Sequence, residues 1–148
     1  MGFTSRHLSI HIDRPAAEVY DFAADPRNLR RWAAGLAGAT VEYADGRWHT
    51  DSPMGRVSFR FVSRNDLGVL DHDVRLPSGE TVRNPMRVLP DDDGCEVVFT
   101  LRQRPGMTDE EYAADVEAVE RDLATLKPVL EQQQSGEFVV PDATNSPD

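Results

Sequence analysis

The chain opens with an alternation of apolar and polar positions. Leu8, Ile10 and Ile12 are each separated by one polar residue. This period of two is typical of a strand with one buried face, and it predicts a strand over residues 6–13.

Two short helices are expected next. Pro15 suits a first helical position, and an apolar stripe that includes Phe22 follows it. Asp25 followed by Pro26 is a typical beginning of a second helix, and Gly35 can end that helix. Neither helix exceeds about three turns, so each must be stabilised by packing against the rest of the fold.

Between Ala39 and Gln103 the period of two returns, and turn signals recur about every ten residues. Asp45-Gly46 is the strongest of these signals, because this pair favours a type I′ hairpin. The six expected strands cover residues 39–44, 47–52, 55–64, 69–76, 82–90 and 95–103.

The lengths of the turns predict which residues face each other, because paired residues in an antiparallel sheet share a face. Each turn, assigned from its own residues, keeps the same face largely apolar across the six strands. The expected pairs are Val41–Thr50, Tyr43–Trp48, Trp48–Phe59, Thr50–Val57, Phe61–His72, His72–Met86, Val74–Asn84, Leu76–Val82, Met86–Phe99 and Val88–Val97. A shift of one residue would mix the faces, so the pattern predicts an antiparallel sheet with one apolar side.

The last element is a long amphipathic helix. Thr108 and Glu111 form a capping box, and the apolar stripe behind them predicts about 26 residues of helix, about 39 Å long. Pro128 is expected to kink or loosen the final turns. A sheet with one apolar face needs a cover, and this stripe can supply it; a coiled-coil seam is the alternative interpretation. The stripe consists of Tyr112, Val116, Val119, Leu123, Leu126 and Leu130.

These elements predict an α+β fold, in which a curved antiparallel sheet of about seven strands wraps around the long C-terminal helix. Two short helices follow the first strand. Residues 1–134 form the expected single domain, which suits a chain of 148 residues. Residues 135–148 carry no apolar pattern beyond Phe138-Val139-Val140 and are expected to form a flexible tail.

Charge and composition narrow the classes of partner. The formal net charge is −10, and acidic residues concentrate between Asp109 and Asp122. Such a field repels phosphate backbones and anionic lipids, so nucleic-acid binding is not expected. Residues 1–20 hold several charges and no continuous apolar core, which argues against a signal peptide and a membrane span. The single cysteine, Cys95, suits a reducing compartment, and we expect a cytoplasmic protein.

The apolar face of the predicted sheet carries two polar side chains, His72 and Asn84, on neighbouring strands. A buried polar group without a partner costs about 1–3 kcal/mol, so each needs one. A ligand or a trapped water would serve, and so would a hydrogen bond between the two side chains or to a backbone carbonyl. The ligand-binding residues expected on this face are Tyr43, Trp48, Phe59, Phe61, His72, Asn84, Met86 and Phe99.

Metal binding has little support in the sequence. Asp71 and Asp73 flank His72, but neighbouring residues of a strand point to opposite faces. No third ligand is evident on the face of His72. His7 and His11 lie about 13 Å apart along one strand, too far to hold one ion together. We therefore expect no metal.

Nucleophilic catalysis has little support either. Cys95 begins a strand beside an acidic turn, which raises the pKa of a thiol, and a small buried apolar role suits it better. Ser58 and Ser63 have no nearby pair of His and acid. No cofactor is expected. The catalytic option that is left is acid–base chemistry by His72.

The run from Ile10 to Trp32, IHIDRPAAEVYDFAADPRNLRRW, resembles the opening of the SRPBCC superfamily. That superfamily includes START-like, Bet v 1-like and polyketide cyclase/dehydrase-like proteins. With the order of the elements, the resemblance covers residues 6–133 and implies the helix-grip fold, with an internal cavity between sheet and long helix. Activities in the superfamily include the binding of lipids, sterols or hormones and the aromatisation or cyclisation of polyketides, and one branch stimulates a chaperone ATPase.

Three functions stand as hypotheses. The leading one is a small-molecule binding protein whose largely apolar cavity takes an aromatic or lipid-like ligand, oriented by His72 and Asn84. The second is a cyclase or dehydratase that uses His72 as base or acid, because an apolar wall keeps imidazole neutral near pH 7. The third is a partner-binding, co-chaperone-like protein that uses the acidic long helix or the C-terminus. The sequence favours no particular oligomeric state.

Overall fold

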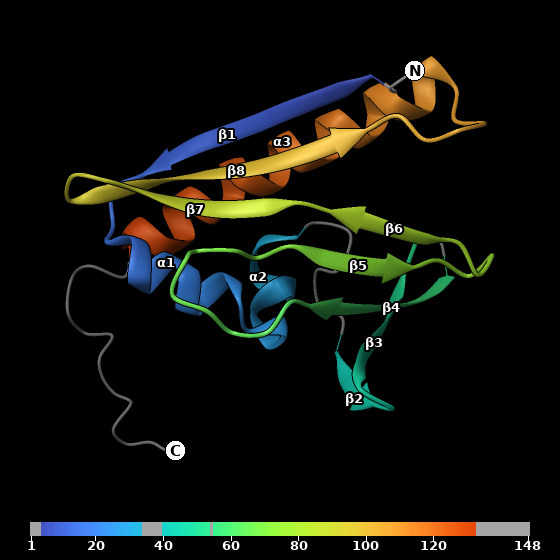
Figure 1. Ribbon diagram of the computed structural model, residues 1–148, viewed down its shortest axis with the longest axis horizontal. Coiled ribbons are helices and arrows are strands. Elements are labelled where there is room, and N and C mark those ends of the chain that lie inside the picture. The colour runs from blue at the N-terminus through green and yellow to red at the C-terminus, as the bar shows by residue number, and fades with distance from the viewer. Residues whose placement is uncertain (1–3, 34–39, 54, 133–148) are drawn as a thin grey trace.

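The computed structural model describes residues 4–33, 40–53 and 55–132. In these residues eight strands form two antiparallel sheets (Figure 1). The first sheet has the order β1 (Ser5–Ile12), β8 (Gly94–Arg102), β7 (Met86–Asp91). The second has the order β2 (Glu42–Ala44), β3 (Arg47–Ser52), β4 (Gly55–Phe61), β5 (His72–Arg75), β6 (Thr81–Asn84). The helices are α1 (Ala16–Ala23), the 3₁₀ turn η1 (Pro26–Asn28), α2 (Leu29–Trp32) and α3 (Asp109–Glu131).

The two sheets meet where β6 runs into β7, and Pro85 separates these two strands. A proline has no N–H to donate to a sheet ladder, so it interrupts a strand. The carbonyl of Pro85 accepts a hydrogen bond from the Thr100 N–H at 3.0 Å, which keeps the chain beside β8. Before Pro85 the chain pairs with β5 as β6, and after Pro85 it pairs with β8 as β7. The predicted strand 82–90 is therefore two strands, which accounts for eight strands where about seven were expected.

Most of the predicted register is confirmed. The observed pairs include Tyr43–Trp48, Trp48–Phe59, Thr50–Val57, Phe61–His72, Met86–Phe99 and Val88–Val97. The register between β5 and β6 was predicted wrongly by two residues, because His72 pairs with Asn84 and Val74 pairs with Val82.

The cause of this shift lies in the turn between β5 and β6. The turn closes with the Leu76 N–H donating to the Glu80 carbonyl at 2.8 Å, so it begins at Pro77, one residue earlier than expected. Pro77 suits the early turn position, and Gly79 adopts a positive φ of 93°. A shift of two residues leaves every side chain on its predicted face, which is why the alternation did not reveal it.

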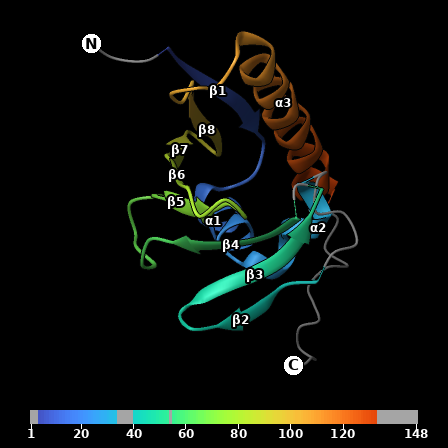
Figure 2. The same cartoon turned by 90° about the vertical axis from the view of Figure 1, so that its right-hand side faces the viewer.

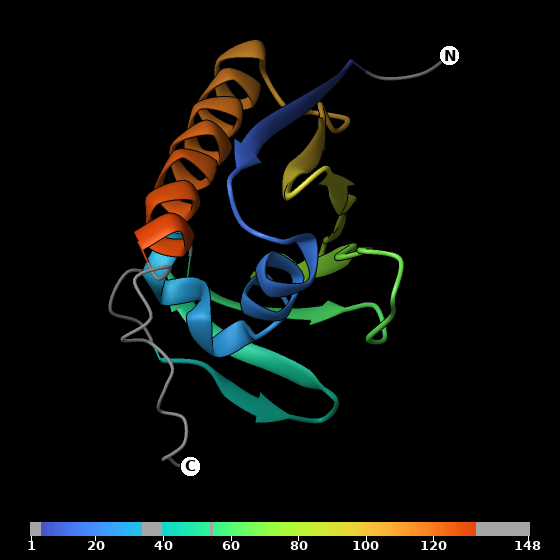
Figure 3. The ribbon, with the colours of Figure 1, turned by 90° about the vertical axis from the view of Figure 1, so that its left-hand side faces the viewer.

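The long helix α3 begins at the predicted capping box. The Thr108 hydroxyl accepts a hydrogen bond from the Glu111 N–H at 3.0 Å, and the Glu111 carboxylate accepts one from the Thr108 N–H at 2.9 Å. The helix continues through Pro128 to Glu131. Figures 2 and 3 show α3 lying along β1, with its C-terminal end beside α2. The predicted helix end at Gly35, the turn residue Met54 and the predicted tail at residues 135–148 lie outside the described residues.

The core lies between α3 and the first sheet. Ile12, Val97 and Leu126 are fully buried there, and so is Cys95. Cys95 is buried, as the sequence predicted, and this burial raises the pKa of its thiol to about 11. No helix in the described part of the chain is long and apolar enough to cross a membrane.

The capping box gives a first testable prediction. Replacing Thr108 with alanine removes the acceptor for the Glu111 N–H, and we expect the free energy of unfolding to fall by about 1 kcal/mol. Thr125→Ala is the matched control, because the Thr125 hydroxyl is exposed and bonds to the Arg121 carbonyl within the helix. We expect this control to change stability by less than about 0.5 kcal/mol. Urea denaturation measures both, and equal effects of the two substitutions would contradict the role of the cap.

Candidate functional site

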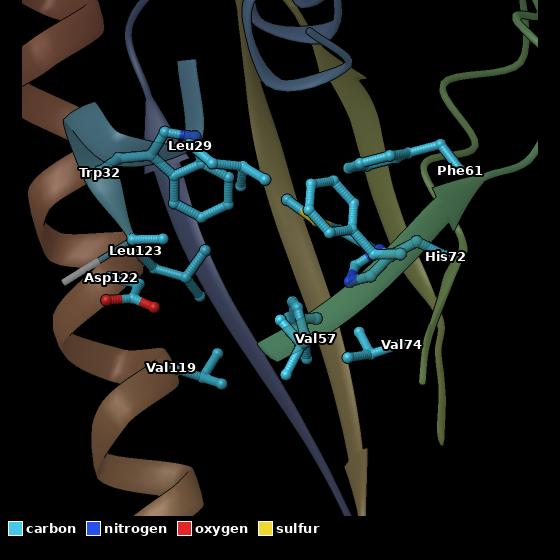
Figure 4. Close-up of a pocket in the computed structure, with 13 residues that line it drawn as sticks. Leu29, Trp32, Val57, Phe61, His72, Val74, Val119, Asp122 and Leu123 are labelled. Atoms are coloured by element: carbon cyan, nitrogen blue, oxygen red, sulfur yellow. The ribbon is translucent and has the colours of Figure 1, made fainter. Parts of the chain in front are cut away.

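A cavity of about 200 Å³ lies between the sheets and the helices α2 and α3 (Figure 4). Its walls come from elements that are far apart in the sequence, and almost all of them are apolar. Leu29, Trp32 and Ala33 come from α2 and its end, whereas Val119, Asp122 and Leu123 come from α3. The sheet residues of the wall are Val57, Phe59, Phe61, His72, Val74, Met86 and Phe99.

Five of the residues predicted for the site line this cavity together: Phe59, Phe61, His72, Met86 and Phe99. They come from strands β4, β5, β7 and β8, so the predicted parity of the strands brought them to one side. Their role in ligand binding stays a prediction.

The structure places the other three predicted residues away from the cavity. Tyr43 is 63% exposed and packs on Trp48, with the ring centroids 5.2 Å apart. The reason is geometric: the β2–β3 hairpin extends away from α3, so the helix does not cover its apolar face (Figure 2). Asn84 lines a neighbouring groove instead, because β6, which precedes Pro85, pairs with β5 in the second sheet and not with β8.

Four wall residues belong neither to the predicted apolar face of the sheet nor to the predicted stripe of the long helix: Leu29, Trp32, Ala33 and Asp122. Leu29 and Trp32 belong to the short helix α2, whose position against α3 depends on tertiary packing alone. Asp122 is an acidic residue, and the acidic run of the helix was interpreted as a solvated surface. Its position could have been predicted from the spacing. Asp122 lies three residues after Val119 and four before Leu126, so the three residues share one face of the helix.

His72 is the polar side chain that projects from the sheet into the cavity wall. Its Nδ1 lies 2.9 Å from the Leu70 carbonyl oxygen. A carbonyl can only accept, so Nδ1 of the neutral ring carries the proton and Nε2 is left as an acceptor. The ring packs against Phe61 at a centroid distance of 4.9 Å and against Phe99 at 5.8 Å.

The surroundings of His72 favour its neutral form. Burial among aromatic rings removes water from the imidazolium and lowers the pKa of His72 below its ordinary value. The hydrogen bond to Leu70 and the charges of Asp71 and Asp73 act in the opposite direction, but they are outweighed. The ring is therefore a neutral imidazole near pH 7.

The two neighbouring aspartates point away from His72, as the alternation predicted. The Asp71 carboxylate accepts hydrogen bonds from Arg87 at 2.9 and 3.0 Å, and these lower its pKa. The Asp73 carboxylate accepts one from Arg47 at 2.6 Å. Both acids are thus committed to ion pairs on the other face of the sheet. In the described residues no three His, Cys, Asp or Glu side chains gather as metal ligands would.

A more polar groove of about 520 Å³ adjoins the cavity between α3 and the β5–β6 hairpin. Val74, Phe99 and Val119 line both spaces, so the groove leads to the cavity. The side chain of Asn84 lines the groove, and no described residue forms a hydrogen bond with it. His72 and Asn84 thus face each other across β5 and β6 without satisfying each other, because His72 bonds to a backbone carbonyl.

The family described as "Polyketide cyclase / dehydrase and lipid transport" matches residues 5–131. The chain belongs to this family. The match confirms the resemblance to the SRPBCC superfamily, and the sheet wrapped on a long C-terminal helix confirms the helix-grip fold. No curated protein sequence matches the chain.

Solved structures share the fold at low sequence identity. Protein CV1439 from Chromobacterium violaceum has a TM-score of 0.66 and 15% identity, and the match covers 86% of this chain and 97% of that one. The di-domain ARO/CYC BexL from the BE-7585A biosynthetic pathway has a TM-score of 0.68 and 18% identity over 89% of this chain. DynU16, a protein in the dynemicin biosynthetic locus, has a TM-score of 0.67 and 14% identity over 86% of this chain. The match covers 48% of BexL and 47% of DynU16, so this chain corresponds to about half of each.

Proposed function

We propose that this member of the family binds a small, largely apolar molecule that contains one or two rings in the cavity between sheet and α3. The observation that carries the proposal is the cavity itself, which has aromatic walls and a volume of about 200 Å³. An engineered apolar cavity of about 150 Å³ stays dry and binds benzene, so a slightly larger one suits a molecule of one or two rings.

The energetics support an occupant. At about 24 cal/mol per Å³, an empty cavity of this size costs on the order of 5 kcal/mol. The whole free energy of unfolding of a domain is only about 5–15 kcal/mol. Water gains little in such a space, because it needs two to four polar partners and the walls are nearly all apolar. An apolar ligand therefore has more to gain there than water does.

The family and these relatives support a ligand-binding role. BexL is an ARO/CYC of a biosynthetic pathway, and DynU16 belongs to the dynemicin biosynthetic locus. Both share the fold of this chain, although identities of 18% and 14% transfer no reaction.

A second candidate, an enzyme of the cyclase or dehydratase type, is favoured by one observation. His72 presents an unprotonated Nε2 on an apolar wall, which is the state a general base needs near pH 7. Phe61 and His72 also line a polar groove together with Arg60, Asp73 and Arg83, through which a proton could exchange with water. With a polyketide substrate, His72→Ala with normal binding and no turnover would favour the enzyme, whereas equal loss of both would not.

Blocking the cavity tests the proposed function. Val119→Trp adds a large ring to the α3 wall, and we expect the affinity for naphthalene to fall at least tenfold because the ring occupies the ligand's space. Ala124→Trp places the same residue on an exposed part of α3 and serves as the matched control, with an unchanged affinity. Naphthalene fluorescence in a protein titration measures the affinities. Failure of the wild-type protein to bind, or equal affinities of the two variants, would overturn the proposal.

A further inference from the structure

We propose that the cavity selects phenols, that is, aromatic ligands with a hydroxyl group on a one- or two-ring system, and that Nε2 of His72 accepts the hydrogen bond from this hydroxyl. The inference rests on the proposed function, because it names the ligand class of the same cavity. It follows from three features of the wall: a fixed tautomer, a lack of accessible donors and flat aromatic neighbours.

The backbone fixes the tautomer of His72. The Leu70 carbonyl that bonds to Nδ1 belongs to a residue that is 1% exposed. Leu70 is itself held to β7, because its N–H donates to the Met86 carbonyl at 2.8 Å. The carbonyl therefore cannot turn away, and the proton of the neutral ring stays on Nδ1. Nε2 is left with a lone pair and no proton.

This lone pair faces the cavity. Figure 4 shows the outer edge of the His72 ring, with its second nitrogen, directed towards the space between the sheet and α3. Nδ1 of the ring bonds to the Leu70 carbonyl, and no described residue forms a hydrogen bond with Nε2. A ligand in the cavity meets an acceptor there.

The other polar atoms of the wall do not supply a donor to the ligand. The Asp122 carboxylate, when ionised, also presents acceptors only. Trp32 carries an indole N–H, but this Nε1 is fully buried and has no hydrogen-bond partner among the described residues. A ketone or an ether oxygen in the ligand is also an acceptor and would therefore find no hydrogen-bond donor in the wall. A hydroxyl can donate a hydrogen bond to the acceptors of the wall.

The walls beside His72 indicate what carries the hydroxyl. Phe61 and Phe99 lie within 6 Å of the imidazole, ring centroid to centroid, on β4 and β8. A planar aromatic ligand can stack on such faces while its edge hydroxyl points at Nε2. A ligand without the donor leaves Nε2 without a hydrogen bond from the ligand. Because an unmade buried hydrogen bond is costly, we expect discrimination of at least about tenfold.

The test compares three probes of similar shape: 2-naphthol, 2-methoxynaphthalene and naphthalene, titrated by calorimetry at pH 7.5. A phenol has a pKa near 10, so 2-naphthol keeps its proton at this pH. We expect the wild-type protein to bind 2-naphthol at least about tenfold more tightly than either other probe. His72→Phe keeps a ring and removes the acceptor, so its preference should fall to about twofold or less.

Two further variants control the result. His49→Phe makes the same change at a residue whose ring bonds to the Ala44 carbonyl far from the cavity, and it should keep the full preference. Should His72→Phe fold poorly, as its thermal unfolding will show, His72→Gln replaces it. The Gln amide oxygen is still an acceptor, so part of the preference should survive.

The pH dependence gives an independent readout. Protonation converts Nε2 into a donor, so the preference for 2-naphthol should stay constant from pH 8 to 6.5 and disappear at lower pH. The charged groups around the ring are Asp71 just before β5, Asp73 on β5, Arg83 on β6 and Asp122 on α3. Because burial lowers the pKa of His72, Nε2 should become protonated, and the preference should be lost, at a pH below the ordinary titration range of histidine.

The outcomes separate the two proposals. Equal affinities for all three probes, each abolished by Val119→Trp, would overturn the selection of phenols and leave the binding function standing. A preference that persists in His72→Phe would overturn the role of His72. Failure of all three probes to bind would overturn the proposed function itself.

Discussion

Replacing Arg47 with alanine is expected to lower the free energy of unfolding by about 3–5 kcal/mol. The Arg47 side chain is 10% exposed and lies on the outer face of the second sheet. Its Nε donates to the Ser58 hydroxyl at 2.8 Å, and its Nη2 donates to the Asp73 carboxylate at 2.6 Å. Alanine would leave the carboxylate of Asp73, itself 13% exposed, without its counter-ion. The pair joins β3, β4 and β5, so its loss also loosens the strand that carries His72.

Arg56→Ala is the matched control. Arg56 also forms ion pairs, with Glu42 at 2.8 Å and Asp51 at 3.1 Å, but its side chain is 50% exposed and solvent screens both pairs. We expect this substitution to cost less than about 1 kcal/mol. Chemical denaturation measures the free energy of unfolding of both variants. Similar small decreases for Arg47→Ala and Arg56→Ala would contradict the interpretation of Arg47 and Asp73 as a buried ion pair. The double variant Arg47→Met with Asp73→Leu should recover most of the stability, because no unpaired charge is left.

Replacing Gly68 with alanine is expected to cost at least about 3 kcal/mol. Gly68 has a φ of +73°, where an L side chain is strained, and a Cβ at this position would overlap the Val88 carbonyl oxygen. The Gly68 carbonyl also accepts a hydrogen bond from the Val88 N–H at 2.8 Å, which ties this segment to β7. Two residues later the same segment supplies the Leu70 carbonyl that holds His72. The variant should therefore lose stability and the fixed tautomer of His72 together.

Gly46→Ala separates backbone strain from contact. Gly46 has a similar φ of +76°, but a Cβ there would meet no atom within 4 Å. We expect a loss of only about 1–2 kcal/mol from strain at this hairpin. Thermal unfolding gives the stabilities, and ¹⁵N NMR of the imidazole reports the tautomer. Equal losses at Gly46 and Gly68 would contradict the proposed contact with Val88.

Side-chain alternation was sufficient to predict which sheet residues share a face, and this is why Phe59, Phe61, His72, Met86 and Phe99 were found in advance. A one-residue error would have moved them all to the other face, so the apolar pattern constrains the register strongly against such errors. The two-residue error between β5 and β6 escaped detection because it moves no side chain to another face.

The failures concern what covers the sheet. Nothing in the alternation of Tyr43 and Trp48 distinguishes a strand under α3 from a strand beyond its end, because that depends on how far the sheet curves. The position of Trp32 depends on a helix of four residues that is held by tertiary contacts. Asp122 could have been found, since it shares a helix face with Val119 and Leu126, but its charge suggested exposure.

The central claim is that an apolar molecule binds between the sheet and α3, and methyl NMR of the protein titrated with naphthalene tests it most directly. The account predicts that the signals of Met86, Val119 and Leu123 on the cavity wall shift together and saturate with one affinity. Leu67 and Leu89, which are 76% and 44% exposed, report binding at the outer surface and should not shift. Shifts confined to Leu67 and Leu89, or no saturable shifts at the wall, would contradict the claim.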